Sequence, residues 1–225
     1  VSEREAIMAL ARKRIEQRIP LPYLTNQIHF AGLPFYVDQR VLIPRSPLAE
    51  LIEQGLQPCI EPYSVERVRE IGTGSGCIAI ACAYLFSQAK VDATDTSQDA
   101  LEVAAINVRR HNLEGRVELY RADVFEGLPE RRYQVIITNP PYVDQQEMAV
   151  LPAEYQHEPY KALAGGADGL DIVRPEGILV VEVGNSEAAV LDTFPDLPAV
   201  WVELERGGRG VFVITAENLV NWWES

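Results

Sequence analysis

The feature that most constrains the fold is a glycine-rich turn between an apolar strand and an apolar helix. The chain runs Glu70-Ile71-Gly72-Thr73-Gly74-Ser75-Gly76 and continues as Cys77-Ile78-Ala79-Ile80-Ala81-Cys82-Ala83. Glycines let the backbone approach a ligand closely, and the free N–H groups at the start of a helix present a positive dipole end to it. The pattern therefore predicts an α/β sheet with a ligand site at this turn, although a tight strand-to-helix connection without a ligand gives the same pattern.

The spacing of the glycines limits which ligand fits. A dinucleotide fingerprint requires G-x-G-x-x-G, and a P-loop ends in Gly-Lys-Ser/Thr. Here the turn is G-x-G-x-G, Cys77 stands where the last glycine of that fingerprint would fall, and no lysine closes the turn. The acidic residue ahead of the turn suits a ligand with an amino group or a sulfonium charge better than one with a pyrophosphate. We therefore expect the cofactor to be held by Glu70, Gly72, Thr73, Gly74 and Gly76.

Two further acids end the next two predicted strands. Asp95 ends the run Val91–Asp95, 23 residues after Gly72, where a carboxylate can accept both hydroxyls of a ribose. Asp123 ends the run Val117–Asp123 and is placed to accept from an exocyclic adenine amine. Either acid could instead cap the helix that follows it. For the predicted helix Gln98–His111, however, Ser97 is available as the cap.

A second motif, Asn139-Pro140-Pro141-Tyr142, follows the apolar run Tyr133–Thr138, which is typical of a buried parallel strand. Ligands of open α/β sheets bind outside the carboxyl ends of the strands. The side-chain oxygen of Asn139 can accept from an NH2 group, and the proline nitrogens donate nothing while their carbonyls stay available. The motif therefore predicts a site that binds a planar amino group, although Asn-Pro is also a common turn signal.

Taken together, these motifs resemble the Rossmann-like S-adenosylmethionine-dependent methyltransferases, and among them the protein glutamine N(5)-methyltransferases of the translation apparatus. The resemblance implies a mostly parallel seven-stranded sheet with a C-terminal antiparallel hairpin, and S-adenosylmethionine as the cofactor. It also implies that Asn139, Pro140 and Tyr142 act in the transfer, with Pro141 lining the substrate site and Tyr142 packing on the flat amide. Further segments that carry the resemblance are Pro20–Leu24, Phe30–Phe35, Val41–Arg45, Glu158-Pro159 and Ala162–Leu170.

Two branches of this family differ in their protein substrate. One methylates the Gly-Gly-Gln glutamine of peptide chain release factors, and the other a glutamine of the third protein of the large ribosomal subunit. The segments Ile43–Ile52 and Leu151–Pro159 resemble the ribosomal-protein branch, which we favour, and the release factor is the alternative. A nucleic-acid amino-methyltransferase is a more distant alternative. It is considered because similar loops bind the exocyclic amines of flipped bases. A module that binds the cofactor without transferring the methyl group is a further class.

Charge and composition decide which of these functional classes fit the sequence best. The formal net charge of −13 over 225 residues argues against DNA binding and suits a basic protein partner, although an acidic surface also simply keeps a protein in solution. The longest apolar run, Cys77–Phe86, is too short to cross a bilayer, and the chain shows no signal peptide. The three cysteines and three histidines lack ligand spacing. We therefore expect a cytoplasmic protein with no metal and no membrane partner.

The chain divides into residues 1–45, a helix and a hairpin that we expect to recognise the substrate, and residues 46–225, the methyltransferase domain. Val1–Arg18 predicts one amphipathic helix with Ile7, Leu10 and Ile15 on one face, and Thr25–Phe30 with Phe35–Asp38 predicts the hairpin. Arg45 is placed to contact the substrate or the acidic rim of the cofactor site, or is a surface arginine. Family members carry a longer helical N-terminal domain, and since this chain begins without methionine we expect that domain to be trimmed.

The C-terminal third departs from the family at one point. Helix signals from Gly169 to Arg174 are followed at once by Pro175-Glu176-Gly177 and a predicted strand, Ile178–Val183. A parallel crossover needs about a dozen residues, so the crossover is either shortened or lacks residues in this sequence. Beyond it, Trp201–Glu205 and Val211–Thr215 predict the antiparallel hairpin that closes the sheet.

Overall fold

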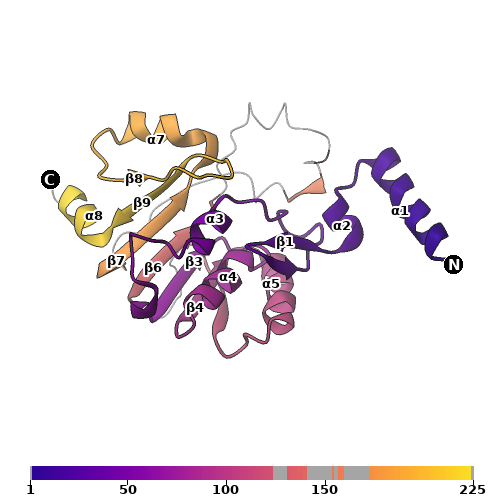
Figure 1. The fold of residues 1–225 in the computed structure, drawn as a ribbon, viewed down its shortest axis with the longest axis horizontal. Coiled ribbons are helices and arrows are strands. Elements are labelled where there is room, and N and C mark those ends of the chain that lie inside the picture. The colour runs from indigo at the N-terminus through magenta and orange to yellow at the C-terminus, as the bar shows by residue number, and fades with distance from the viewer. Residues whose placement is uncertain (1, 124–130, 141–153, 155–156, 160–172, 224–225) are drawn as a thin grey trace.

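A mixed sheet of seven strands in the order β5-β4-β3-β6-β7-β9-β8 forms the centre of the protein (Figure 1). The computed structural model describes residues 2–123, 131–140, 154, 157–159 and 173–223. Neighbouring strands from β5 to β7 are parallel, and β9 pairs antiparallel with both β7 and β8, which confirms the predicted fold class. The strands are β3 Arg67–Ile71, β4 Lys90–Asp95, β5 Val117–Arg121, β6 Tyr133–Thr138, β7 Val173–Glu182, β8 Val200–Trp201 and β9 Val211–Thr215.

The register of the parallel strands brings their carboxyl ends to one edge of the sheet. Ile71 at the end of β3 lies opposite Thr94 of β4 and Thr138 of β6, and Asp95 lies opposite Arg121 of β5. Because ligands of such sheets bind outside the carboxyl ends of the strands, this edge is where a site is expected. The residues that follow the strands at this edge include Gly72, Asp123 and Asn139.

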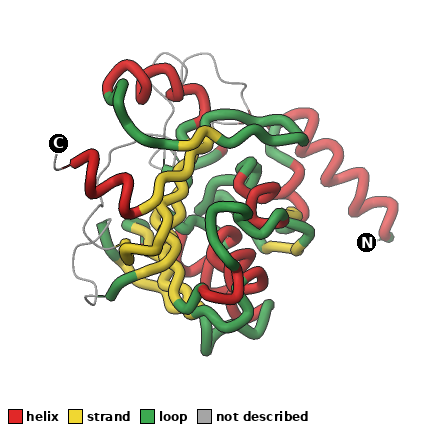
Figure 2. Tube along the Cα trace, turned by 60° about the vertical axis from the view of Figure 1, so that its left-hand side comes forward, coloured by secondary structure: helices red, strands yellow, loops and turns green. Residues whose placement is uncertain are grey.

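Helices cover the two faces of the sheet (Figure 2). The helices α4 (Cys77–Leu85) and α5 (Gln98–Arg110) pack on one face, where α4 buries seven of its nine residues. The helix α3 (Leu48–Glu53) packs beside α4. The helix α8 (Ala216–Trp223) lies on the opposite face, where its Leu219 packs with Phe212 and Ile214. The strand β6 is buried along its whole length, as its apolar sequence predicts for a central parallel strand.

The N-terminal segment contains α1 (Glu3–Gln17), α2 (Leu21–Thr25) and a hairpin of β1 (Ile28–Phe30) and β2 (Leu33–Phe35). The helix α1 is confirmed, but it buries no side chain, and Ile7 and Ile15 of its apolar face are 58% and 75% exposed. The hairpin differs from the prediction in both strands: β1 starts later than predicted, and the second strand is Leu33–Phe35 and not Phe35–Asp38. Thr25 belongs to α2, and after β2 the backbone N–H of Tyr36 donates to the Asn107 side chain of α5 at 2.7 Å instead of to β1.

The C-terminal part corrects two predictions. Val173 and Arg174, which the sequence assigns to a helix, lie in β7, while residues 160–172 lie outside the described part. The strand β8 ends at Trp201, although the sequence predicts a strand to Glu205. Further along, the predicted end of this strand is held by α3, where the buried carboxylate of Glu50 accepts from the backbone N–H groups of Glu205 at 2.6 Å and of Arg206 at 2.9 Å.

The described residues also include a 3-10 turn over Pro62–Ser64, another over Gly184–Ser186, and the helix α7 (Glu187–Thr193) that follows it. None of the described helices combines the length and the apolar character that crossing a lipid bilayer requires.

Candidate active site

The glycine turn is held onto the end of β4. The backbone N–H groups of Gly72 and Thr73 donate to the Thr94 carbonyl at 2.9 and 2.8 Å. Gly72 (φ 74°) and Gly74 (φ 53°) face open space, since a Cβ at either position would meet no atom within 4 Å. A Cβ on Gly76 (φ 80°) would lie 3.2 Å from that of Ala104 in α5. The first two glycines therefore leave room for a ligand, and the third allows α4 and α5 to approach each other.

The carboxyl group of Glu70 lies inside this turn. Glu70 is only 1% exposed, and its Oε2 accepts from the Thr73 hydroxyl and, at 2.9 Å, from the backbone N–H of Ala79 in the first turn of α4. Among the described residues, its Oε1 has no hydrogen-bond partner. Burial raises the pKa of Glu70 to about 8, against the smaller lowering effect of the Thr73 and Ala79 hydrogen bonds. Glu70 therefore holds the glycine turn to the start of α4, and its Oε1 has no hydrogen-bond partner among the described residues.

Asp95 also binds the turn. Its two carboxylate oxygens accept from the backbone N–H groups of Gly74 and Ser97, each at 2.9 Å. The Ser97 hydroxyl caps α5 by accepting from Ala100 at 3.3 Å, as the sequence predicts. The half-buried Asp95 is thus a link between β4 and the glycine turn, and the capping role belongs to Ser97.

Asp123 lies two residues beyond the end of β5 and is exposed. The backbone N–H of Ala122 donates to the Asp95 carbonyl at 3.1 Å, which brings the end of β5 beside the end of β4. Asp95 and Asp123 therefore occupy the same edge of the sheet as the glycine turn.

Asn139 and Pro140 follow β6 directly and are half-buried. The Thr138 hydroxyl just before them donates to the Ile71 carbonyl at 3.0 Å, so the end of β6 is fastened to the end of β3. This contact sets Asn139 next to the start of the glycine turn. Pro141 and Tyr142 lie outside the described residues.

Arg45 forms an ion pair with Glu158. Its Nη1 donates to both carboxylate oxygens of Glu158, at 2.8 and 3.1 Å. The side chain of Glu158 is buried and also accepts from the backbone N–H of Ile43 at 3.2 Å. The pair joins the segment after the N-terminal hairpin to the segment that follows the Asn139 motif in the chain.

A second set of contacts between these regions has no local sequence signal. Arg14 and Arg18 of α1 donate to the carboxylate of Glu154, at 3.1 Å for Arg14 and at 2.9 and 3.1 Å for Arg18. The ring Nε2 of His157 lies 3.0 Å from the Gln17 carbonyl. The hydrogen bonds from Arg18 hold the pKa of Glu154 low, at about 2. Because 136 residues separate Arg18 from Glu154, only the folded chain shows that they meet.

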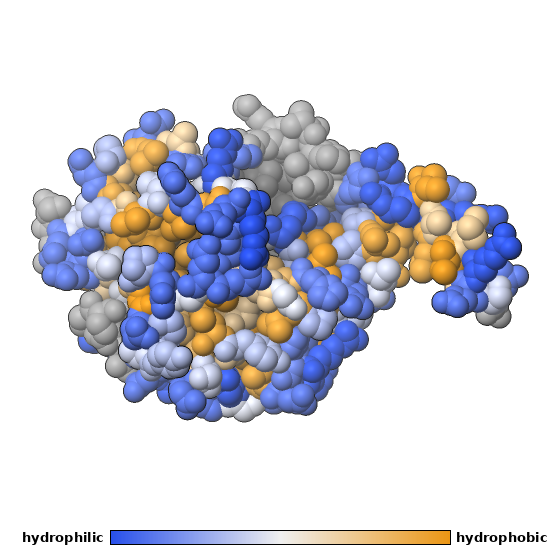
Figure 3. All heavy atoms as spheres, in the orientation of Figure 1, coloured by the Kyte–Doolittle hydropathy of each residue, from blue (hydrophilic) through white to orange (hydrophobic). Residues whose placement is uncertain are grey.

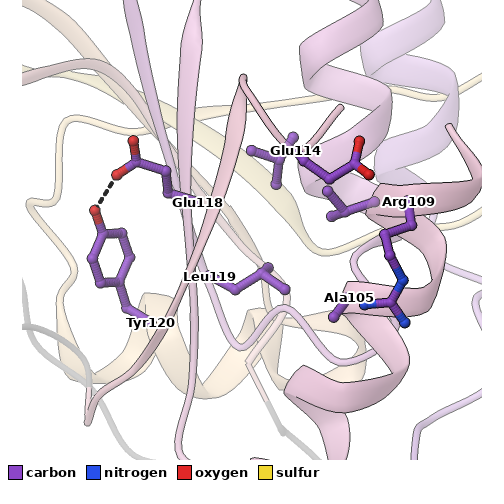
Figure 4. A pocket seen from close by; sticks show the side chains of 8 residues that line it. Ala105, Arg109, Glu114, Glu118, Leu119 and Tyr120 are labelled. Atoms are coloured by element: carbon purple, nitrogen blue, oxygen red, sulfur yellow. Dashed lines mark hydrogen bonds between the residues drawn. The ribbon is translucent and has the colours of Figure 1, made fainter. Parts of the chain in front are cut away.

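The described surface also has hollows away from this edge. One of about 470 Å³ lies between α5 and the outer side of β5, lined by residues such as Ala105, Arg109 and Leu119 (Figure 4). The Glu118 carboxylate there is already hydrogen-bonded by Tyr120. A second hollow, of about 400 Å³, lies beside the hairpin and His111. None of the predicted site residues lines either hollow. Within the described ranges, no three His, Cys, Asp or Glu side chains are grouped as a metal site requires.

Two solved structures with related folds are described as methyltransferases or their catalytic domains. The catalytic domain of hMettl16 in complex with an RNA hairpin is 16% identical, with a TM-score of 0.63 over 94% of this chain and 80% of that chain. A 16S rRNA N2-guanine methyltransferase from T. thermophilus, in complex with AdoMet and guanosine, is 16% identical, with a TM-score of 0.56 over 84% of this chain and 49% of that chain. At this identity the similarity shows the fold.

Sequence comparison is more specific. The family model of the methyltransferase small domain matches residues 54–157. A ribosomal protein uL3 glutamine methyltransferase from Bordetella pertussis is 45% identical over 97% of this chain and 77% of its own length. One from Burkholderia pseudomallei is 47% identical over 96% of this chain and 77% of its own length. With this identity over nearly its full length, the chain belongs to the family of ribosomal protein uL3 glutamine methyltransferases.

Proposed function

We propose that this protein transfers a methyl group from S-adenosylmethionine to the side-chain amide nitrogen of a glutamine in the large-subunit ribosomal protein uL3. The observation that carries the proposal is the pairing of β3 with β6, which sets Asn139 and Pro140 beside the glycine turn. The identity of the substrate, uL3, is taken from the names of the relatives from Bordetella pertussis and Burkholderia pseudomallei.

The residues at the glycine turn fit the methyl donor. S-adenosylmethionine supplies an electrophilic methyl group on a sulfonium sulfur. The open sides of Gly72 and Gly74 leave space for it beside the turn, and the Glu70 Oε1, which has no partner among the described residues, is a hydrogen-bonding group at the turn. Asp95 is assigned to the ribose hydroxyls and Asp123 to the adenine amine, because both follow strands at the same edge.

The chemistry depends mainly on positioning. A glutamine amide nitrogen is a poor nucleophile because its lone pair is delocalised into the carbonyl. Holding two reactants in line can remove on the order of 7–11 kcal/mol of a barrier. Positive charge grows on the nitrogen during transfer, so acceptors fixed on that nitrogen stabilise the transition state more than the ground state. We propose the Asn139 side-chain oxygen and the Pro140 carbonyl as these acceptors, and the family resemblance implies that Tyr142 takes part in binding the amide. The alkylated nitrogen becomes acidic and loses its proton to water, so no dedicated base is required.

We further propose that residues 1–45 recognise the substrate and that residues 46–225 are the catalytic domain. Two observations support this division. The helix α1 exposes its apolar residues, and its Arg18 contacts Glu154 in the segment that follows the Asn139 motif. The second half of the N-terminal segment, in contrast, packs on the catalytic domain, where Phe30 and Phe35 are part of the main core.

The test is a comparison of three acceptors. The purified protein is incubated with labelled S-adenosylmethionine and, side by side, with unmodified uL3, a release factor and duplex DNA, and the label is located by mass spectrometry. We expect label on a uL3 glutamine. Label on the release-factor Gly-Gly-Gln would keep the mechanism and change the substrate, and label on DNA alone would overturn the substrate class.

A further inference from the structure

The C-terminal helices carry an apolar surface that the catalytic site does not use. At the end of α7, Leu191 and Phe194 are each 44% exposed, and on α8 Val220 and Trp223 are 49% and 65% exposed. Figure 3 shows hydrophobic residues (orange) among hydrophilic ones (blue) over α7 and the neighbouring strand β8. Exposed aromatic groups of this size are uncommon on a free protein surface and are typical of interaction sites.

Contacts between aromatic rings join the exposed residues at the end of α7 to those of α8. The Phe194 and Trp222 rings meet edge to face with centroids 5.8 Å apart, and Trp222 and Trp223 lie 6.3 Å apart. Leu191 is three residues before Phe194, and Val220 is three residues before Trp223, which places each pair on one side of its helix. We call Leu191, Phe194, Val220, Trp222 and Trp223 the C-terminal surface.

Acidic residues surround the C-terminal surface. Asp192 and Asp196 flank Leu191 and Phe194 and are exposed, and the exposed Glu217 is one helical turn before Val220. Residues 175–225 contain nine Asp or Glu and two bases, Arg206 and Arg209, which lie between β8 and β9. This charge repels phosphate and acidic segments, and it attracts basic ones.

The opposite end of the chain has the opposite charge. Residues 1–45 contain seven Lys or Arg and four Asp or Glu. A basic partner segment therefore has a weaker electrostatic reason to bind α1 than to bind α7 and α8. The two ends of the protein are suited to different parts of a substrate.

The α7 part of the C-terminal surface is also within reach of the catalytic edge, whereas α8 begins after Thr215 of β9, which lies opposite Ile178 of β7 and away from that edge. The strand β7 pairs in parallel with β6, which carries Asn139 at its carboxyl end. The helix α7 follows the carboxyl end of β7 through the short turn Gly184–Ser186. A protein with a glutamine at Asn139 can therefore extend along this edge onto α7.

From these observations we propose that the C-terminal surface docks a basic segment of the ribosomal-protein substrate, outside the segment that carries the methylated glutamine. The proposal rests on the proposed function for the identity of the substrate. A ribosomal protein binds RNA, and RNA-binding surfaces are rich in Lys and Arg, whose long side chains also offer apolar stems to Trp and Phe. The aromatic residues then supply contact area and the surrounding acids supply charge complementarity.

The test compares two matched pairs of variants of the full chain. Asp192→Lys with Glu217→Lys reverses charge beside the C-terminal surface, and Glu61→Lys with Glu114→Lys makes the same change in net charge at exposed acids elsewhere. Leu191→Ser with Val220→Ser removes apolar area, and Tyr63→Ser, at a side chain that is 91% exposed, is its control. The KM, the kcat and the dissociation constant are measured for unmodified uL3, together with S-adenosylmethionine affinity and melting temperature.

We expect the KM and the dissociation constant for uL3 to rise about tenfold in the Asp192→Lys/Glu217→Lys variant. Both constants should rise in Leu191→Ser/Val220→Ser as well. The kcat, the cofactor affinity and the melting temperature should stay as in the wild type, and the control variants should bind uL3 normally. Unchanged uL3 binding in both surface variants would overturn the docking proposal even if methylation is observed. If uL3 is not methylated at all, the proposed function fails, and the dissociation constants alone then decide whether the surface docks this protein.

Discussion

At the scale of single residues, two carboxylates shape the glycine turn from within the protein. Glu70 accepts from Thr73 and Ala79, and Asp95 accepts from Gly74 and Ser97. Glu70 thus satisfies one backbone N–H of the helix start and the Thr73 hydroxyl, and Asp95 satisfies two backbone N–H groups, which a tight turn and a helix start leave without partners. A change at either residue should alter the shape of the turn as well as any direct contact with the cofactor.

Asn139→Ala should remove an acceptor from the transferred amide nitrogen and leave the glycine turn intact. Turnover should fall by at least about 100-fold, as when a single fixed hydrogen-bonding group is removed from a transition state. The dissociation constant for S-adenosylmethionine should change little. Methyl transfer kinetics and calorimetry measure the two quantities, and unchanged turnover would contradict the role of Asn139.

Asp95→Ala should weaken S-adenosylmethionine binding by roughly 1–3 kcal/mol, because it removes an acceptor for the ribose and the support of Gly74. Ser97→Ala is the matched control, since it removes the cap of α5 and leaves Asp95 in place. Calorimetric titration of both variants separates these roles. Equal cofactor affinity in Asp95→Ala and the wild type would place Asp95 outside the site.

Glu70 should make stability depend on pH. Its pKa is about 8 in the folded protein and near 4.5 in the unfolded chain, so between these values the folded state holds a proton that the unfolded state has lost. The free energy of unfolding should therefore fall as the pH rises through this window, by up to about 1.4 kcal/mol per pH unit. Glu70→Gln can still accept from Ala79 and has no such titration. In urea titrations across this range, the variant should gain stability relative to the wild type as the pH rises, and parallel curves would refute the assignment.

At the scale of secondary structure, α1 is joined to the rest of the protein by polar contacts. Its capping box, in which Ser2 and Glu5 exchange hydrogen bonds, stabilises its first turn, and none of its side chains is buried. Its contacts with the rest of the fold include the ion pairs of Arg14 and Arg18 with Glu154. The orientation of this helix therefore depends on charge more than on packing.

Arg14→Ala with Arg18→Ala should release α1. Because Arg18 lowers the pKa of Glu154 to about 2, the attraction is fully present above about pH 4.5 and is lost as the pH falls through about 2. At neutral pH, hydrogen exchange of the α1 amides should become faster in the double variant, while exchange in β3 and β6 stays as in the wild type. Arg4→Ala, a change on the same helix, is the control. Slow α1 exchange in the double variant would show that other contacts hold the helix.

At the scale of the whole molecule, charge is unevenly distributed along the chain. The first 45 residues have an excess of bases, and residues 151–225 contain 13 Asp or Glu against four Lys or Arg. Net charge alone cannot show this asymmetry. The basic N-terminal segment carries the proposed recognition helix α1, and the acidic C-terminal part carries the proposed docking surface. Asn139, at the catalytic edge of the sheet, lies between them in the sequence.

Cofactor binding should stabilise the whole fold, because the proposed site joins the ends of β3, β4 and β6. At a concentration of about 100 times the dissociation constant, S-adenosylmethionine should add about 2.7 kcal/mol to the free energy of unfolding. Thermal melts with and without the cofactor measure this effect. Asn139→Ala should show the full rise in melting temperature and Asp95→Ala a smaller one, whereas the absence of any rise in the wild type would contradict the site.

The sequence by itself determined the parts that local chemistry encodes. The glycine spacing predicted the strand–turn–helix from β3 to α4, continuous apolar runs predicted the buried strands, and Ser97 was identified as the cap of α5. The motif residues were enough to identify the family, because their order along the chain is specific to it.

Only the tertiary structure decided which distant polar groups meet. Arg69 is 2% exposed within β3 and donates to the Tyr133 hydroxyl at 3.3 Å, and Tyr133 donates to Asp92 at 2.6 Å. The sequence predicts the strands that carry these residues but not their contact. The same holds for Arg45 with Glu158, and for the Glu50 carboxylate with the backbone N–H of Glu205. The physical reason is that propensity and periodicity act over a few residues, whereas an ion pair or a buried hydrogen bond forms between whichever groups the completed sheet brings within about 3 Å.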